Sequence, residues 1–315
     1  MAAGIVKKGR IRPRRAAGGS SLKWRRDLFE KFVAAVMFIA ASSSVIITLG
    51  IAGVLIYESA SFFTHVSPIA FLTGTVWKPQ FANPEYGILP LVSGTLVTTC
   101  VALSVALPVG TVVAIYLSEF APFSVREVIK PLLELLSAVP TVVYGYFALM
   151  LVSPLLQKVI PNLPLQNMLS AGIVMGIMII PYVSSLSEDA MRSVPMLLRE
   201  GSYALGGNKI TTALRVVLPS ALSGIGAAYI LGISRAIGET MIVAVAAGMQ
   251  PKLTANPTEQ AATMTAYIVQ VSLGDVQHGT VSYQSIFAVG ITLFCMTLVF
   301  NILGQILRRR FHQAY

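Results

Sequence analysis

Two opposite charges, Arg235 and Glu239, lie inside an apolar stretch that runs from Ser220 to Ala247. An arginine at the centre of a bilayer costs about 2.5 to 3.5 kcal/mol on insertion scales, so it is seldom there without a reason. Four residues apart, the two side chains would lie one turn from each other on a continuous helix, and we expect them to pair. Two interpretations are open: the pair locks the helix against its neighbours, or it contacts a charged solute.

An arginine in this position has chemistry that suits an oxyanion. Its guanidinium is a planar fork of N–H donors that matches phosphate oxygens and could hold the anion transiently. The carboxylate of Glu239 would repel the anion and so prevent it from binding too tightly. We further hypothesise that Glu239 accepts a hydrogen bond from a protonated phosphate oxygen, a contact that sulfate cannot make at neutral pH. A Glu239→Gln variant that still distinguishes phosphate from sulfate as the unchanged protein does would contradict this hypothesis.

A second segment, EGSYALGGNKITTALRVVLP, occupies residues 200–219 between two strongly apolar stretches. Its helix-compatible residues form two short pieces that are separated by Gly206 and Gly207, which permit a sharp change of direction. Small residues such as Gly201 and Ser202 would let the first piece lie deep in a groove of a partner. The plain alternative is an amphipathic hairpin that lies on the membrane surface.

The composition places both segments in an integral membrane protein. Of the 315 residues, 55% are hydrophobic and only 11% are charged, whereas a soluble domain of this size needs far more charged surface. The formal net charge of +10 is concentrated in tails and short loops, so it indicates membrane topology and not nucleic-acid binding. Cys100 and Cys295 lie in apolar runs and the three histidines lie outside them, so we expect no disulfide and no metal site.

The elements that must position these residues are six apolar stretches, each long enough to cross the hydrocarbon as a helix of about 20 residues. They lie near residues 32–57, 88–117, 129–151, 167–186, 220–247 and 285–307. Pro108, Pro140 and Pro181 interrupt the second, third and fourth stretches and predict kinks. The sequence therefore predicts an all-α membrane protein with six transmembrane helices.

Small residues recur at intervals of four along the fifth stretch. They are Ser220, Gly224, Ala228, Gly232, Ala236, Thr240, Ala244 and Gly248. Such a row lets helix backbones approach closely, which favours helix association in lipid. Gly172 and Gly176 form a shorter row in the fourth stretch, where we also expect close packing.

Lysine and arginine set the orientation, because these residues are retained in the cytoplasm during insertion. They are concentrated in the N-terminal tail, at the C-terminus and after the second and fourth stretches, whereas the other three loops hold only Lys78, Lys158 and Lys252. We therefore expect both termini and the loop at about residues 188–219 to be cytoplasmic. Residues 1–30 form a basic tail that we expect to be disordered, and residues 31–315 form the membrane domain.

Several of these segments resemble a known family. The loop resembles the EAA loop of ABC importer permeases, with Gly201 and Ser202 in place of two alanines, then Gly206, and an ending at Val216, Leu218 and Pro219. The stretch SRAIGETM at residues 234–241 resembles a signature of the permeases of the phosphate-specific ABC transporter, of the PstC type more than the PstA type. YGILP at 86–90, IYLSE at 115–119 and AVPTVVYG at 138–145 extend the resemblance.

This resemblance implies a type I ABC importer permease fold with a cytoplasmic coupling (EAA) loop in the bacterial plasma (inner) membrane. It implies that Arg235 and Glu239 line the phosphate pathway and that the loop docks on an ATPase through Glu200, Gly201, Ser202, Gly206, Leu218 and Pro219. The implied partners are a second permease of the PstA type, two ATP-binding subunits of the PstB type and an extracytoplasmic phosphate-binding protein. No cofactor is implied. Because no G-x-x-x-x-G-K-[ST] motif occurs, this chain is not expected to hydrolyse ATP.

Other functions fit the residues less well. A permease for sulfate or molybdate would differ only in cargo, and SRAIGETM argues against it by resemblance alone. A secondary transporter or channel would need more ionisable residues across its spans, yet besides Arg235 and Glu239 only Glu134 is found there. A membrane enzyme is disfavoured because the motifs assemble no nucleophile, base and orienting group. Deleting residues 200–219 should release the ATPase from an ABC permease, whereas a channel should still conduct.

Overall fold

The computed structural model describes residues 20–274, 276–277 and 279–310, so most of the basic tail lies outside the described residues. The chain divides into two compact units, residues 1–54 and 55–315. In the first unit the described residues form the greater part of helix α1 (Ser20–His65), which begins well before residue 32, where the sequence placed the first span. The most apolar stretch of α1 has no buried side chains, which suits a helix surrounded by lipid.

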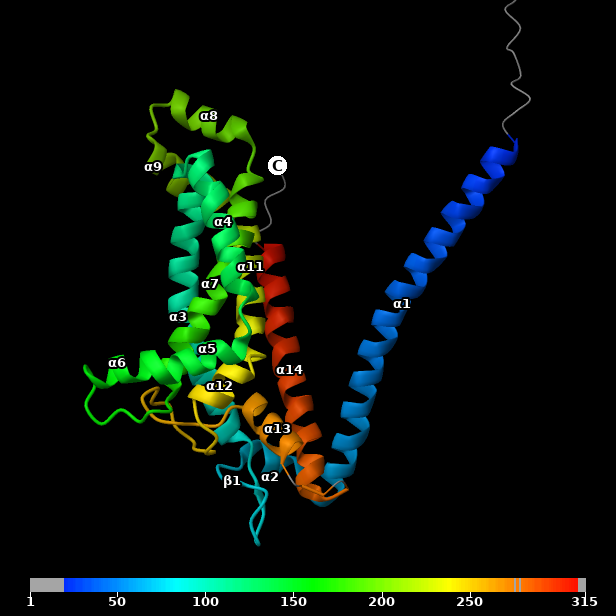
Figure 1. Ribbon diagram of the computed structural model, residues 1–315, viewed down its shortest axis with the longest axis vertical. Helices are drawn as coiled ribbons and strands as arrows, with labels where there is room; N and C mark the ends of the chain where they lie inside the picture. The colour runs from blue at the N-terminus through cyan, green and yellow to red at the C-terminus, as the bar shows by residue number, and fades with distance from the viewer. Residues whose placement is uncertain (1–19, 275, 278, 311–315) are drawn as a thin grey trace, which may run out of the picture. The chain divides into compact units, whose positions relative to one another are not determined.

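Within the described residues, four helices are long and apolar enough to cross a membrane, and the number rises to six if each of two bent pairs of helices is one span. The four are α1, α3 (Leu89–Ile115), which continues through η1 (Tyr116–Phe120), α7 (Met168–Arg192) and α14 (Val281–Arg310). Figure 1 shows α3, α7, α11 and α14 running side by side. Pro108 and Pro181 lie inside α3 and α7 without ending them.

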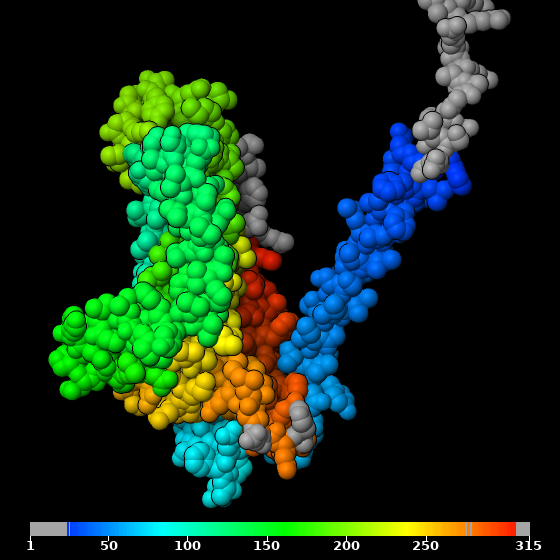
Figure 2. Space-filling view, viewed as in Figure 1, coloured from blue at the N-terminus to red at the C-terminus, as the bar shows by residue number. Residues whose placement is uncertain are grey.

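The third apolar stretch is broken at Pro140, where the sequence predicted a kink, and the bend is larger than a kink within one continuous helix. Helix α4 (Phe123–Ala138) ends where α5 (Thr141–Phe147) begins, and η2 (Ala148–Val152) and α6 (Ser153–Gln157) continue α5 at 89° to α4. Val139 is extended, with φ −64° and ψ 130°, because the ring of the following proline disfavours the helical conformation. The α5–α6 segment therefore projects sideways from the bundle (Figure 2).

The fifth crossing is broken as well, at both ends of its central helix. Helix α9 (Lys209–Thr212), η3 (Ala213–Val217) and α10 (Leu218–Ser220) meet α11 (Leu222–Ile237) at 71°. After α11 the chain turns at Gly238 and enters the short helix α12 (Met241–Ala246). The single helix expected over residues 220–247 is therefore wrong: the candidate span is the bent pair that ends with α11, and the residues after α11 lie on a separate element.

Close packing of α7 with its neighbours forms the core of the second unit. A Cβ atom at Gly172 would lie 2.6 Å from Cβ of Val101 on α3, so only glycine allows this approach. On the other side, a Cβ atom at Gly232 of α11 would lie 3.2 Å from Cγ2 of Val183 on α7. The predicted close packing at the small residues of the fourth and fifth spans is confirmed at these positions.

The end of the unit opposite α8 and α9 is closed by aromatic side chains. Strand β1 (Trp77–Lys78) pairs antiparallel with β2 (Glu85–Tyr86), and α2 (Pro68–Thr73) and α13 (Met264–Leu273) lie in the same region (Figure 1). The Trp77 ring makes edge-to-face contacts with the rings of Phe71, Tyr86 and Tyr267. These contacts anchor the hairpin between α2 and α3 to the helices.

Candidate functional site

Arg235 lies near the end of α11, one turn beyond Gly232, where a Cβ atom would lie 3.2 Å from Val183 of α7. Its guanidinium carbon is 4.3 Å from the centre of the Tyr182 ring, and Nη2 is 4.0 Å from Sδ of Met178. The Nε atom is buried and has no hydrogen-bond partner in the part of the chain that the structure describes. A cation over an aromatic face is attracted by the negative ring face, so Tyr182 stabilises this charge without being an anion.

The expected pairing of Arg235 with Glu239 is wrong. Among the described residues no ion pair joins them, and the reason is the end of α11: the four-residue spacing brings side chains together only while the helix continues. Glu239 instead accepts hydrogen bonds from the backbone N–H groups of Met241 at 3.0 Å and Ile242 at 3.3 Å. The carboxylate thus caps α12, where the unpaired N–H groups favour a negative charge.

Glu239 is also held from the other side. Its side chain is buried, and its backbone carbonyl accepts a hydrogen bond from Oγ1 of Thr265 on α13 at 2.7 Å. The residue therefore joins the start of α12 to α13 directly after the break that follows Arg235. The structure places the two predicted pathway residues on either side of this break, with different partners.

The segment predicted to be two short helices separated by glycines is confirmed. Helix α8 (Met196–Ala204) ends before Gly206, whose φ of +84° is strained for any residue with a side chain, and α9 follows. The side chain of Asn208 caps α9 by accepting from Thr211 N at 2.8 Å. A contact of 2.8 Å between Ser202 Oγ and Thr212 Oγ1 ties the two helices together.

The outer surface of this hairpin carries a small residue and exposed apolar side chains that are not needed for packing within its own chain. A Cβ atom at Gly201 would meet nothing within 4 Å, so the small size of this residue serves no packing inside the structure. Leu197 is 78% exposed and Leu205 is 91% exposed. Glu200 is exposed beside Gly201, and Figure 2 shows the hairpin protruding at one end of the unit. Clustered apolar exposure of this kind is typical of a surface that contacts another protein.

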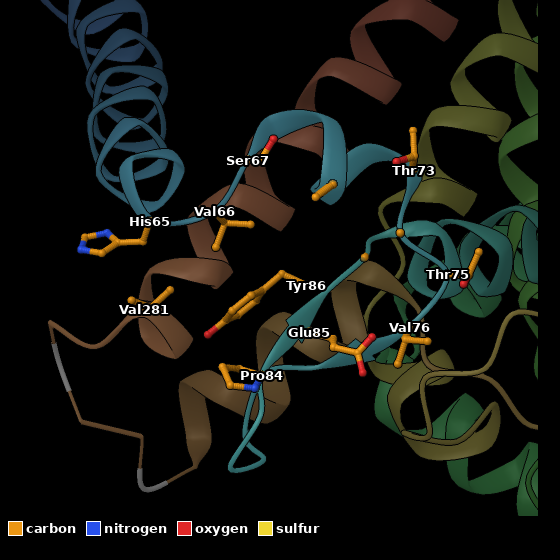
Figure 3. A pocket seen from close by; sticks show the side chains of 13 residues that line it. His65, Val66, Ser67, Thr73, Thr75, Val76, Pro84, Glu85, Tyr86 and Val281 are labelled. Atoms are coloured by element: carbon orange, nitrogen blue, oxygen red, sulfur yellow. The ribbon is translucent and has the colours of Figure 1, made fainter.

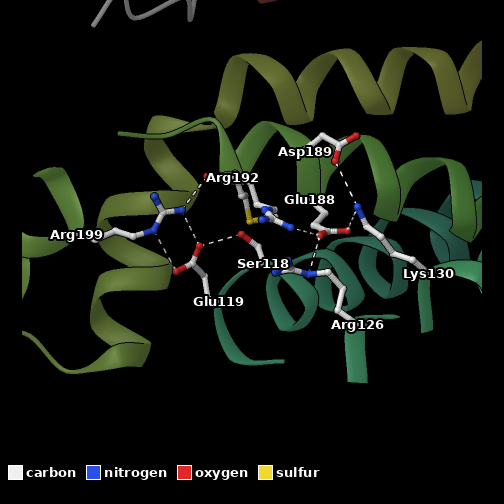
Figure 4. Close-up of polar contacts among 9 residues, drawn as sticks. Ser118, Glu119, Arg126, Lys130, Glu188, Asp189, Arg192 and Arg199 are labelled. Carbon is white, nitrogen blue, oxygen red and sulfur yellow. Dashed lines mark hydrogen bonds and ion pairs between the residues drawn. The ribbon is translucent and has the colours of Figure 1, made fainter. Parts of the chain in front are cut away.

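An ion pair that the sequence analysis missed fastens this hairpin to the bundle. Arg199 of α8 donates to Glu119 of η1 twice, from Nε to Oε2 at 3.3 Å and from Nη2 to Oε1 at 2.9 Å. The same guanidinium donates to the backbone carbonyls of Val194 at 2.6 Å and Met191 at 2.9 Å. Ser118 Oγ also donates to Glu119 (Figure 4). One arginine thus connects α8, η1 and the end of α7.

A second ionic cluster lies beside the first. The fully buried carboxylate of Glu188 on α7 forms ion pairs with Arg126 and Lys130 of α4 at 3.4 and 3.0 Å, and with Arg192 at 3.6 Å (Figure 4). Lys130 also pairs with the exposed Asp189. The sequence presented these cations only as topology signals, because nothing in the spacing shows that α4 and α7 end side by side.

At the opposite end, a pocket of about 730 Å³ opens between the end of α1, α2 and the β1–β2 hairpin. His65, Ser67, Thr75, Glu85 and Tyr86 are among the polar residues that line it (Figure 3). Most of its lining lies between the first two apolar stretches, and Val281 of α14 completes it. It is distant in the fold from the α8–α9 hairpin (Figure 1).

Comparison with known proteins gives the family. Residues 106–313 match the model of the family described as binding-protein-dependent transport system inner membrane component. Over 277 residues the chain is 35% identical to the probable ABC transporter permease protein YqgH of Bacillus subtilis (strain 168), and the match covers 88% of each chain. It is 31% identical to the phosphate transport system permease protein PstC of Xylella fastidiosa (strain 9a5c), covering 93% of this chain and 94% of that protein.

Solved structures share the fold. A bacterial ABC transporter involved in the import of the acidic polysaccharide alginate matches with a TM-score of 0.64 and 14% identity, over 92% of this chain and 100% of that chain. The MetNI methionine ABC transporter matches with a TM-score of 0.53 and 16% identity, over 72% of this chain and 95% of that chain. The predicted type I ABC importer permease fold is confirmed. The chain belongs to the inner membrane components of binding-protein-dependent transport systems, as a non-catalytic, multi-pass permease subunit of an ABC importer.

Proposed function

We propose that this permease is of the PstC type and forms half of the pathway of an ATP-driven phosphate importer. The observation that carries the proposal is the state of Arg235, a partly buried cation that pairs with no carboxylate among the described residues and has a buried Nε without an acceptor. A desolvated cation in this condition is stabilised by an anion that reaches it. Relatives named as phosphate transport permeases support phosphate as that anion.

Arg235 is the proposed contact for phosphate oxygens. Glu239 stays in the proposal as the second pathway residue, because it fixes the break directly after Arg235 and adds a negative charge at that point. An arginine with no permanent carboxylate partner binds an arriving anion without first breaking an ion pair. The nearby negative charge then limits how long the anion stays, which transport requires.

We propose that the α8–α9 hairpin is the coupling loop, with Glu200, Gly201, Ser202, Gly206, Leu218 and Pro219 in the segment that docks on one of two PstB-type ATPase subunits. The exposed Leu197 and Leu205 and the unused space at Gly201 support a protein partner on this surface. The cations at this end, among them Arg192 and Lys209, support a cytoplasmic location for the hairpin and for both termini.

The remaining proposed partners are a PstA-type permease and a phosphate-binding protein that delivers the anion at the opposite end. The pocket at the β1–β2 hairpin lies on that side in the proposed orientation. A different cargo, sulfate or molybdate, is the alternative that a transport assay must separate, because all three anions present oxygens to a guanidinium.

The test is uptake of labelled phosphate by proteoliposomes that hold the complete complex and its binding protein. We expect ATP-dependent uptake that excess sulfate or molybdate does not inhibit, and that Arg235→Gln abolishes. Arg26→Gln is the matched control, because Arg26 is exposed on α1 and forms a surface ion pair with Glu30. Uptake that survives Arg235→Gln, or that sulfate inhibits, would contradict the proposal.

A further inference from the structure

We propose that Tyr182 is a positioning residue for Arg235: its ring holds the guanidinium by the face and leaves the N–H edge to an oxyanion. The inference rests on the proposed function, because it explains how Arg235 can serve an anion that must bind and leave. Nothing in the family signature at residues 234–241 points to Tyr182, which lies on another helix.

Helices α11 and α7 pack closely beside Arg235. Gly232 lies one turn before Arg235, and a Cβ atom there would lie 3.2 Å from Val183 and 3.5 Å from Ile179. Val183 directly follows Tyr182, so the packing of α11 on α7 at Gly232 also brings Arg235 close to the tyrosine ring. The resulting 4.3 Å between guanidinium carbon and ring centre is a close stacking distance.

The guanidinium of Arg235 can be contacted at its edge or at its face. Its five N–H groups point outward in one plane, so a carboxylate or phosphate binds at the edge, whereas an aromatic ring binds at the face. A carboxylate partner would occupy the donors that the substrate needs. A ring stabilises the same charge and leaves the edge free, which agrees with the buried Nε that has no acceptor.

Arg235 has a second neighbour on α7. Met178 lies one turn before Tyr182 on α7, and its sulfur is 4.0 Å from Nη2 of Arg235. A thioether is a weak acceptor and gives up a donor easily. Both contacts from α7 are therefore weak individually, and together they orient the cation without competing strongly with an oxyanion.

The test changes the electron density of the ring while keeping its shape. In the complete complex, Tyr182 is replaced by phenylalanine and then by phenylalanines that carry one, two and three ring fluorines, and ATP-dependent phosphate uptake is measured. We expect phenylalanine to support transport, and the logarithm of the rate to fall stepwise with fluorine number to a total loss of about two- to thirty-fold. The same series at Tyr146, which is 61% exposed on α5, is the control and should leave the rate unchanged.

Packing alone would not produce this gradient, because fluorine changes the ring volume little. A flat series at residue 182, in complexes that assemble and bind ATP normally, would overturn the positioning role and leave the proposed function intact. Tyr182→Leu should lose transport as well, but it also changes the packing, so the fluorine series decides. A wild-type complex that takes up no phosphate would overturn the proposed function and the inference together.

Discussion

The ion pair between Arg199 and Glu119 yields a quantitative prediction about the attachment of the α8–α9 hairpin. The two side chains are only 11% and 6% exposed, so solvent screens them weakly. Removing one partner of a buried pair typically costs about 3 to 5 kcal/mol, because the other charge stays buried without compensation. We expect Glu119→Leu to cost about 3 kcal/mol, the low end of this range, since the carbonyls of Met191 and Val194 still accept from Arg199.

Removing both charges should be less harmful than removing either one. In the double variant Glu119→Leu, Arg199→Met no charge is left behind, and the remaining loss is the two carbonyls without donors, at about 1 kcal/mol each. We therefore expect the free energy of unfolding of the double variant to be about 2 kcal/mol lower than that of the wild type. This loss is smaller than the loss in either single variant.

The assay is unfolding of the purified protein in mixed micelles by increasing sodium dodecyl sulfate, followed through tryptophan fluorescence and extrapolated to zero denaturant. The control is Glu30→Leu, which removes the exposed pair between Arg26 and Glu30 and should cost about 0.5 kcal/mol or less. If the double variant lost as much stability as the two single variants added together, the pair would not act as a unit and this reasoning would be refuted.

Three further predictions concern other parts of the site. Glu188→Gln should destabilise the protein by about 3 kcal/mol, because it leaves three cations around a buried neutral amide, and the same micelle assay measures this. Gly206→Ala should cost about 1 kcal/mol or more through its φ of +84°, and it should reduce co-purification of the ATPase, whereas Gly201→Ala, inside α8, should not destabilise the protein. Glu239→Gln should keep the cap on α12 through its amide oxygen, whereas Glu239→Ala should lose about 1 kcal/mol; equal stability losses in the two variants would argue against the cap.

Sequence reasoning succeeded where a local signal determined local structure. The paired glycines at residues 206–207 stand between two helix-compatible pieces, and the chain turns there as expected. The glycines of the fourth and fifth spans predicted close helix contacts, because in lipid only small residues allow them. The resemblance at residues 234–241 led to the family that the comparisons confirm.

It failed where the outcome depends on whether a helix continues. Residues 220–247 are predominantly apolar on both sides of the break, so hydropathy cannot distinguish one helix from α11 followed by α12. Gly238 was the available signal that the helix ends between Arg235 and Glu239. A helix end at that point removes the reason to expect the two side chains to pair. Pro140 did mark the break in the third crossing, but the 89° bend depends on contacts that α5 makes with α12, such as Gly145 against Val245.

The ionic contacts were beyond sequence reasoning for a different reason. Glu119 and Arg199 are far apart in the chain, and each looks like an ordinary charge at a membrane boundary. Only the packing of α3 against α7 brings η1 next to α8. The same holds for Tyr182, which became relevant to Arg235 only when α7 and α11 were seen to approach at Gly232.

The four bonds of Arg199 have a mechanical consequence. A hinge between α7 and α8 would need a flexible connection. Here the guanidinium instead hydrogen-bonds to η1 and to the last turn of α7 at the same time, and so holds α8 against both. These bonds support the short connection at residues 193–195, so α8 is attached to the bundle through side-chain contacts as well as through the chain. One of the two long helices to which it is attached, α7, also carries Tyr182, the ring that contacts Arg235.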